Sequence, residues 1–183
     1  MRDTKMEVLR FWFEESEPAQ WFQINPAFDA EITERFSCTH DMVSKDLCND
    51  WARDADGALA LCIVLDQFPR NMFRGTPKAF ASDEKALLIA KESIQKGFDI
   101  ILPPLKRRFM YLPFEHSEDI KEQEKSVKYF GTMKDTDPLG LEYAIRHHDV
   151  IKRFGRFPHR NKIFGRDSTD QEQKFLEQFP LGF

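Results

Sequence analysis

Three short polar segments of this sequence carry the side chains best suited to binding or acid–base chemistry. The first, residues 65–75, offers a carboxylate, two amides and two guanidinium groups: Asp66, Gln67, Arg70, Asn71 and Arg74. Arginine holds carboxylate and phosphate groups through two parallel hydrogen bonds, and amides add further donors and acceptors. This segment is therefore a candidate binding site for an anion.

The second segment, residues 111–119, contains His116 and, two positions later, Glu118. A histidine that a carboxylate orients can accept a proton from water or from a nucleophile. His116 is thus the candidate general base, and Glu118 is its candidate partner. A purely structural interpretation stays open, in which Ser117 caps a helix and Glu118 interacts with the positive end of the helix dipole.

The third segment, residues 146–166, is strongly basic, with seven lysine and arginine residues against one aspartate. This charge is local, because the whole chain has a net charge of −4. The segment's candidate ligand-binding residues are Arg153, Arg156, His159, Arg160 and Asn161. Alternatively, these arginines pair with carboxylates and hold neighbouring helices together.

The sequence contains no motif for a metal or a cofactor. His147 and His148 are adjacent on a predicted helix, where neighbouring side chains point about 100° apart, so the pair does not suit one metal ion. Glycine-rich nucleotide-binding loops and the nucleophile elbow of serine hydrolases are absent from the sequence. We therefore expect no cofactor and no metal.

Helices are the elements predicted to position the three segments. Asn25 and Pro26 mark one helix start, after which Phe28, Ile32 and Phe36 recur every four residues along one face. Residues 58–65 are all apolar, which predicts a fully buried central helix over residues 58–68 that ends at Pro69. We expect an all-α protein of seven or eight helices. Since no low-complexity linker divides the chain, we expect a single domain over residues 1–183.

The composition agrees with a compact helical protein. Hydrophobic residues make up 41% of the 183 residues and charged residues 32%, close to the averages of globular domains. The three cysteines form no closely spaced pair, and the longest apolar run, residues 58–65, is far shorter than the roughly 20 residues of a membrane span. We expect a cytoplasmic protein that does not bind membranes.

Several long motifs make the chain resemble the bacterial family catalogued as domain of unknown function 924. They are VLRFWF at 8–13, WF at 21–22, LDQFPRN at 65–71 with FRG at 73–75, FMYLPFEHSE at 109–118, and FGRFPHRN at 154–161 with GR at 165–166. The resemblance implies an all-α fold of antiparallel helical pairs, similar to tetratricopeptide-repeat proteins. It implies no reaction.

The leading functional hypothesis is a binding module. Helical arrays often bind ligands on a concave face. If the polar segments converge there, they would form an Arg/His-lined pocket for a small anion, a phosphorylated metabolite or the acidic end of a peptide.

Three alternatives stay open. One is a hydrolase for an anionic substrate, with His116 as general base and with Arg70 and Arg156 stabilising negative charge. Another is nucleic-acid binding through residues 146–166, which the negative net charge disfavours. In the third, the arginines serve only to hold helices together.

Overall fold

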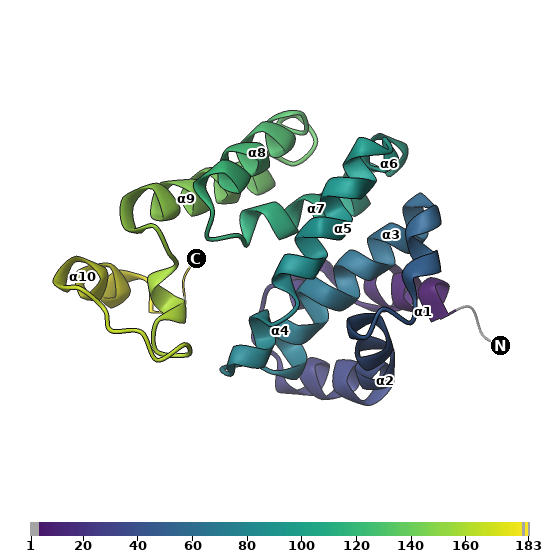
Figure 1. Ribbon diagram of the computed structural model, residues 1–183, viewed down its shortest axis with the longest axis horizontal. Coiled ribbons are helices and arrows are strands. Elements are labelled where there is room, and N and C mark those ends of the chain that lie inside the picture. Colours follow the sequence, from purple (N-terminus) through teal and green to yellow (C-terminus); the bar gives the residue numbers. More distant parts are fainter. Residues whose placement is uncertain (1–3, 181, 183) are drawn as a thin grey trace. The chain divides into compact units, whose positions relative to one another are not determined.

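The computed structural model describes residues 4–180 and 182, which fold into helices joined by turns (Figure 1). Ten α-helical segments occur in this part of the chain, with short π-helical and 3-10 turns beside them. The extended backbone described there amounts to an isolated bridge between Pro180 and Gly182. The all-α prediction is confirmed.

The chain divides into two compact units, which we call unit 1 and unit 2. Unit 1 runs to Arg74 and includes Lys78–Pro113, and unit 2 consists of Gly75–Pro77 and the residues from Phe114 onward. The second boundary falls inside a helix, α7 (Pro104–Glu115), at its internal Pro113. The single domain over residues 1–183 stays a prediction.

Unit 1 is built around the apolar segment that the sequence places at its centre. Besides most of α7, its helices are α1 (Thr4–Arg10), α2 (Pro26–Ser44), α3 (Ala55–Cys62), α4 (Phe68–Met72), α5 (Asp83–Gln95) and α6 (Phe98–Ile101). Residues 58–65 are almost completely buried, and α3 packs against α1 and α5. The prediction of a buried central helix is confirmed.

The expected helix end at Pro69 is wrong. A π-helical turn, Ile63–Gln67, leads from α3 directly into α4, which continues through Pro69 to Met72. Proline has no N–H to donate to the carbonyl group four residues earlier, that of Leu65. The hydroxyl group of Ser82 donates to this carbonyl oxygen instead, at 2.6 Å. The buried carbonyl group therefore keeps a hydrogen bond, and the helical path continues past the proline.

Unit 2 contains α8 (Ile120–Gly131), α9 (Pro138–Phe154), a 3-10 turn (Pro158–Arg160) and α10 (Asp170–Gln178). Helices α8 and α9 lie side by side (Figure 1). Asp119, rather than Ser117, caps α8 by accepting from the Lys121 amide, while the Ser117 hydroxyl group accepts from the Asp119 amide. One apolar cluster of the unit consists of Val150, Ile151 and Phe157, with Ile120, Phe154 and Phe175 packed against them.

Gly57 allows α3 to pack closely on the preceding turn, because a Cβ atom there would overlap the carbonyl oxygen of Trp51. We expect Gly57→Ala to lower the free energy of unfolding by about 1 kcal/mol, since overpacking outweighs the better helix propensity of alanine. Urea denaturation measures this loss. Gly131→Ala is the control, because its Cβ would have open space. Equal losses in both variants would contradict the expectation.

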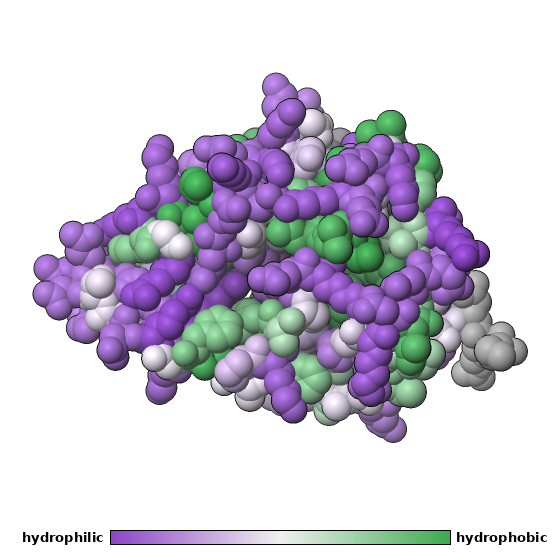
Figure 2. All heavy atoms as spheres, viewed as in Figure 1, coloured by the Kyte–Doolittle hydropathy of each residue, from purple (hydrophilic) through white to green (hydrophobic). Residues whose placement is uncertain are grey.

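The surface is mainly polar on the face that Figure 2 shows, where hydrophobic groups form separate small patches between hydrophilic side chains. The most exposed large apolar residues, Ile100 and Ile101, belong to the short helix α6. Among the described residues, no helix is both long and apolar enough to cross a membrane.

Candidate functional site

Three histidines of unit 2 and the ring of Phe157 form a continuous series of ring contacts. We call this group the histidine cluster, and it consists of Glu115, His116, His147, Phe157, His159 and Arg160. The ring centroid of His147 lies 6.3 Å from that of His116 and 5.5 Å from that of Phe157. The ring centroids of Phe157 and His159 are 5.6 Å apart.

Three separate segments supply the cluster. Glu115 ends α7 and His116 follows it, whereas His147 lies in the middle of α9. Gly155 ends α9 in a left-handed conformation, with φ of 71°, which glycine adopts without strain. The chain then turns into the 3-10 turn that carries His159 and Arg160.

His147 is held as a neutral imidazole. Its Nδ1 atom lies 2.9 Å from the carbonyl oxygen of Tyr143, and because a carbonyl group only accepts, Nδ1 carries the proton. Burial, followed by the positive charges of His116, Arg160 and His159, lowers the pKa of His147 to about 3. Near neutral pH its Nε2 atom is therefore a hydrogen-bond acceptor.

Arg160 and Glu115 give the cluster buried charged groups. The guanidinium carbon of Arg160 lies 4.5 Å from the centroid of the Phe157 ring, a distance typical of a cation–π contact. Both residues are buried, and Glu115 Oε1 is 3.4 Å from His147 Nδ1. Within the described residues, no group of three or more His, Cys, Asp or Glu side chains has an arrangement that could hold a metal ion.

Asn161 follows the cluster and has an unused acceptor. Its Nδ2 atom donates to the hydroxyl group of Ser168 at 3.1 Å. Its buried Oδ1 atom accepts no hydrogen bond from the described residues. Such atoms in folded proteins usually bond to water or to a ligand.

Glu118, the predicted partner of His116, bonds to other groups. Its carboxylate accepts two hydrogen bonds from Arg166, at 2.7 and 2.9 Å, and one from the Phe157 amide at 2.8 Å. Burial alone would raise the pKa of Glu118, but these donors and the charge of Arg166 hold it below its ordinary value. Glu118 thus fixes the loop that carries Phe157.

Arg156 also pairs within unit 2. Its guanidinium group donates to both oxygens of Glu172, at 2.7 and 2.9 Å, and to the carbonyl oxygen of Asp167. The Glu172 carboxylate in addition accepts from the Thr169 amide in a capping box. By contrast, Arg153 is exposed, lies against its neighbour Phe154 and has no carboxylate partner among the described residues.

The chain matches a family model over almost its whole length. The family is described as "Bacterial protein of unknown function (DUF924)", and its model matches residues 8–179. The chain belongs to the DUF924 family. A solved structure, that of the protein of unknown function ATU0120 from Agrobacterium tumefaciens, is similar, with 38% sequence identity and a TM-score of 0.91. The alignment covers 96% of this chain and 97% of that one.

These comparisons confirm the family resemblance that the sequence motifs suggest. The curated proteins contain no significant match to the chain. Membership of the DUF924 family therefore identifies neither a reaction nor a ligand.

The first predicted segment of this DUF924 protein lies in unit 1 and forms internal ion pairs. Arg70 pairs with Asp66 and Asp83, and both Asn71 and Arg74 donate to Asp29. Gln67 donates to Asp66. The structure thus brings the second and third predicted segments together within unit 2, while the first belongs to unit 1.

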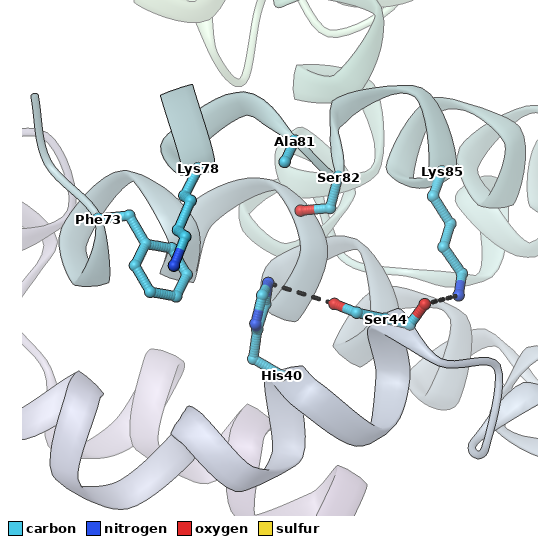
Figure 3. Close-up of a pocket in the computed structure, with 7 residues that line it drawn as sticks. All are labelled: His40, Ser44, Phe73, Lys78, Ala81, Ser82 and Lys85. Atoms are coloured by element: carbon cyan, nitrogen blue, oxygen red, sulfur yellow. Dashed lines mark hydrogen bonds between the residues drawn. The ribbon is translucent and has the colours of Figure 1, made fainter. Parts of the chain in front are cut away.

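A cavity of about 280 Å³ in unit 1 is lined by residues that are not among the candidate site residues predicted from the sequence (Figure 3). It is lined by His40, Ser44, Phe73, Lys78, Ala81, Ser82 and Lys85. A signal for it exists in the sequence, because His40 and Ser44 continue the four-residue spacing of Phe28, Ile32 and Phe36. Polar side chains on the inner face of a helix often mark a site rather than a core.

Proposed function

We propose that this DUF924 protein is a binding module whose histidine cluster binds a small anion, such as a phosphorylated metabolite or the acidic end of a peptide. The proposal rests on one observation: His116 lies beside the neutral His147, and the Phe157 ring next to His147 also contacts His159 and Arg160. Arg160 carries a positive charge and His116 and His159 can each gain one, so that together they would outweigh the carboxylate of Glu115 and attract anions.

The donor groups of the cluster suit phosphate or carboxylate. Arg160 presents N–H groups in a planar arrangement, and its contact with Phe157 limits the motion of the guanidinium plane. His116 and His159 are only partly buried, so a ligand can approach their rings. Hydrogen bonds from charged donors to an oxyanion are about twice as strong as neutral ones.

Three other arginines of the basic segment have carboxylate partners within unit 2. Arg156 and Arg166 each donate two hydrogen bonds to a carboxylate of unit 2, and Arg146 pairs with Glu142. A ligand would have to replace these partners. We therefore expect anion affinity to depend on the histidine cluster rather than on Arg156.

Two of the alternatives, a hydrolase with His116 as general base and a nucleic-acid-binding protein, stay predictions. A general base needs a group that orients it, and the Glu118 carboxylate already accepts from Arg166 and Phe157. Nucleic-acid binding needs several cations free to contact phosphates, and internal ion pairs engage at least three of the seven basic residues in 146–166. Neither alternative has an observation in its favour.

Inorganic phosphate is the first probe, measured by calorimetric titration of the full chain. We expect saturable binding and an affinity at least tenfold lower in His116→Gln and His159→Gln, since each variant removes one donor and one potential charge. His148→Gln is the matched control. His148 neighbours His147 on α9 but has its side chain beside Asp149, and we expect no change.

Phosphorylated sugars and short peptides with acidic ends extend the probe set. Absence of binding by every probe would contradict the proposal. So would phosphate binding that His116→Gln and His159→Gln leave unchanged. Loss of binding in His148→Gln to the same extent would show a general charge effect and would contradict it too.

A further inference from the structure

The cavity of unit 1 lies between α2 and the segment that leads into α5. In Figure 3, His40 and Ser44 lie on α2, Phe73 and Lys78 lie on one side, and Lys85 lies on the other. Its volume of about 280 Å³ is near the lower limit for pockets that bind small molecules. A ligand that fills it must be small.

One wall of the cavity is aromatic. The rings of His40 and Phe73 meet edge to face, with centroids 5.5 Å apart. Ala81 adds an apolar surface between Phe73 and the start of α5. Flat or branched apolar groups pack well against such a wall, because aromatic rings favour edge-to-face and offset contacts.

The two lysines differ in what they already bind. Lys85 Nζ donates to the carbonyl oxygens of Val43 and Ser44, at 2.6 and 3.1 Å, and pairs with Asp46 at 2.9 Å. Its charge thus stabilises the C-terminal end of α2. Lys78 Nζ lies 5.9 Å from the centroid of the Phe73 ring, and Lys78 has no carboxylate partner among the described residues. Lys78 is therefore the cation that can bind an anionic group.

His40 and Ser44 supply neutral polar groups. The Nε2 atom of His40 lies 3.4 Å from the hydroxyl oxygen of Ser44. Burial lowers the pKa of His40, although the charge of Asp41 acts in the opposite direction, so the ring is neutral near pH 7. The Ser82 hydroxyl group, by contrast, already donates to Leu65.

We infer that this cavity binds a small monocarboxylate with an aromatic or branched apolar body. Lys78 pairs with the carboxylate, Ser44 and His40 donate to it or to its bound water, and Phe73 packs against the apolar body. A single available cation beside an aromatic wall favours one negative charge over the two of a phosphate group. The cavity shares no residue with the histidine cluster, so this binding is separate from the function proposed above.

Phenylacetate and phenylacetamide are the matched probes, because they differ in the charge of one group. Calorimetric titration of the full chain should show saturable binding of phenylacetate and at least tenfold weaker binding of the amide. Lys78→Gln should weaken phenylacetate binding at least tenfold. Lys106→Gln is the control, since Lys106 also lies over a phenylalanine ring, that of Phe13 at 5.5 Å, but does not line the cavity.

Three results would overturn the inference. They are no saturable phenylacetate binding by the wild-type chain, equal affinity for the acid and the amide, and phenylacetate binding that Lys78→Gln leaves unchanged. Phosphate binding that depends on Lys78 and exceeds that of phenylacetate would also overturn the proposed ligand class. Because Lys78 is exposed, the variant is expected to fold, and thermal unfolding confirms this before titration.

Discussion

Replacing Arg70 by methionine is expected to lower the free energy of unfolding by about 3 to 5 kcal/mol. Arg70 pairs with Asp66 at 3.3 Å and donates to both carboxylate oxygens of Asp83 at 3.0 and 3.1 Å. Asp66 is 0% exposed. The variant would therefore leave a carboxylate in the core without its cation, which costs far more than a surface ion pair contributes.

Urea denaturation followed by circular dichroism measures this effect. Arg74→Met is the matched control in the same segment, because Arg74 is exposed and its partner Asp29 would still accept a hydrogen bond from Asn71. Its loss should be at most about 1 kcal/mol. If Arg70→Met unfolds like the wild type but no longer binds phosphate, the structural role is wrong and Arg70 is a ligand-binding residue.

Replacing Glu172 by glutamine is expected to lower the free energy of unfolding by about 2 kcal/mol at neutral pH. The side chain of Glu172 is 2% exposed, and its carboxylate bonds to Arg156 and to the Thr169 amide. We expect a smaller loss than the pKa shift alone implies, because the Arg156 side chain is partly in water, which screens the pair.

The same variant tests how the free energy of unfolding depends on pH. Hydrogen bonds from Arg156, opposed by burial and helped by Thr169 and Asn161, lower the pKa of Glu172 from 4.5 to about 2. A lowered pKa in the folded state means that the stabilisation is complete above 4.5 and disappears as the pH falls through about 2. Between these values, the wild type should lose stability more steeply than Glu172→Gln.

Glu177→Gln is the control for both measurements. Glu177 is exposed on the same helix α10, so its replacement should change stability by less than about 0.5 kcal/mol. A parallel pH dependence of the wild type and Glu172→Gln would contradict the assigned role of the Arg156–Glu172 pair.

Local features of the fold could be predicted because they depend on neighbouring residues. Asn25 caps α2 by accepting from the amides of Ala27 and Phe28. The Thr169 and Glu172 capping box begins α10, and Gly155 ends α9. In each case, the two hydrogen-bonding groups lie within four residues of each other.

Features that depend on distant residues could not be predicted. The helix that continues past Pro69 needs the Ser82 hydroxyl group, seventeen residues after Leu65. The partner of Arg166 is Glu118, forty-eight residues away. The sequence shows that arginines concentrate in residues 146–166, but it does not show which carboxylates approach them.

The candidate site was predictable only in part for the same reason. The sequence selects His116, His159 and Arg160, and all three belong to the histidine cluster. It does not reveal that His147 of α9 lies beside both His116 and Phe157, or that Glu118 bonds to Arg166. The sequence does not predict the cavity lined by His40, because Phe73, Lys78 and Lys85, which also line it, are distant from His40 in the chain.

The three hydrogen bonds of Glu118 also affect the thermodynamics of binding. They hold Phe157 and the loop up to Arg166 in place without any ligand. A ligand at the histidine cluster would meet a preorganised receptor, and association would cost little conformational entropy. The backbone of this loop should therefore be equally rigid on the nanosecond timescale with and without phosphate. The affinity for phosphate would then depend on its contacts with the protein and not on ordering of the loop.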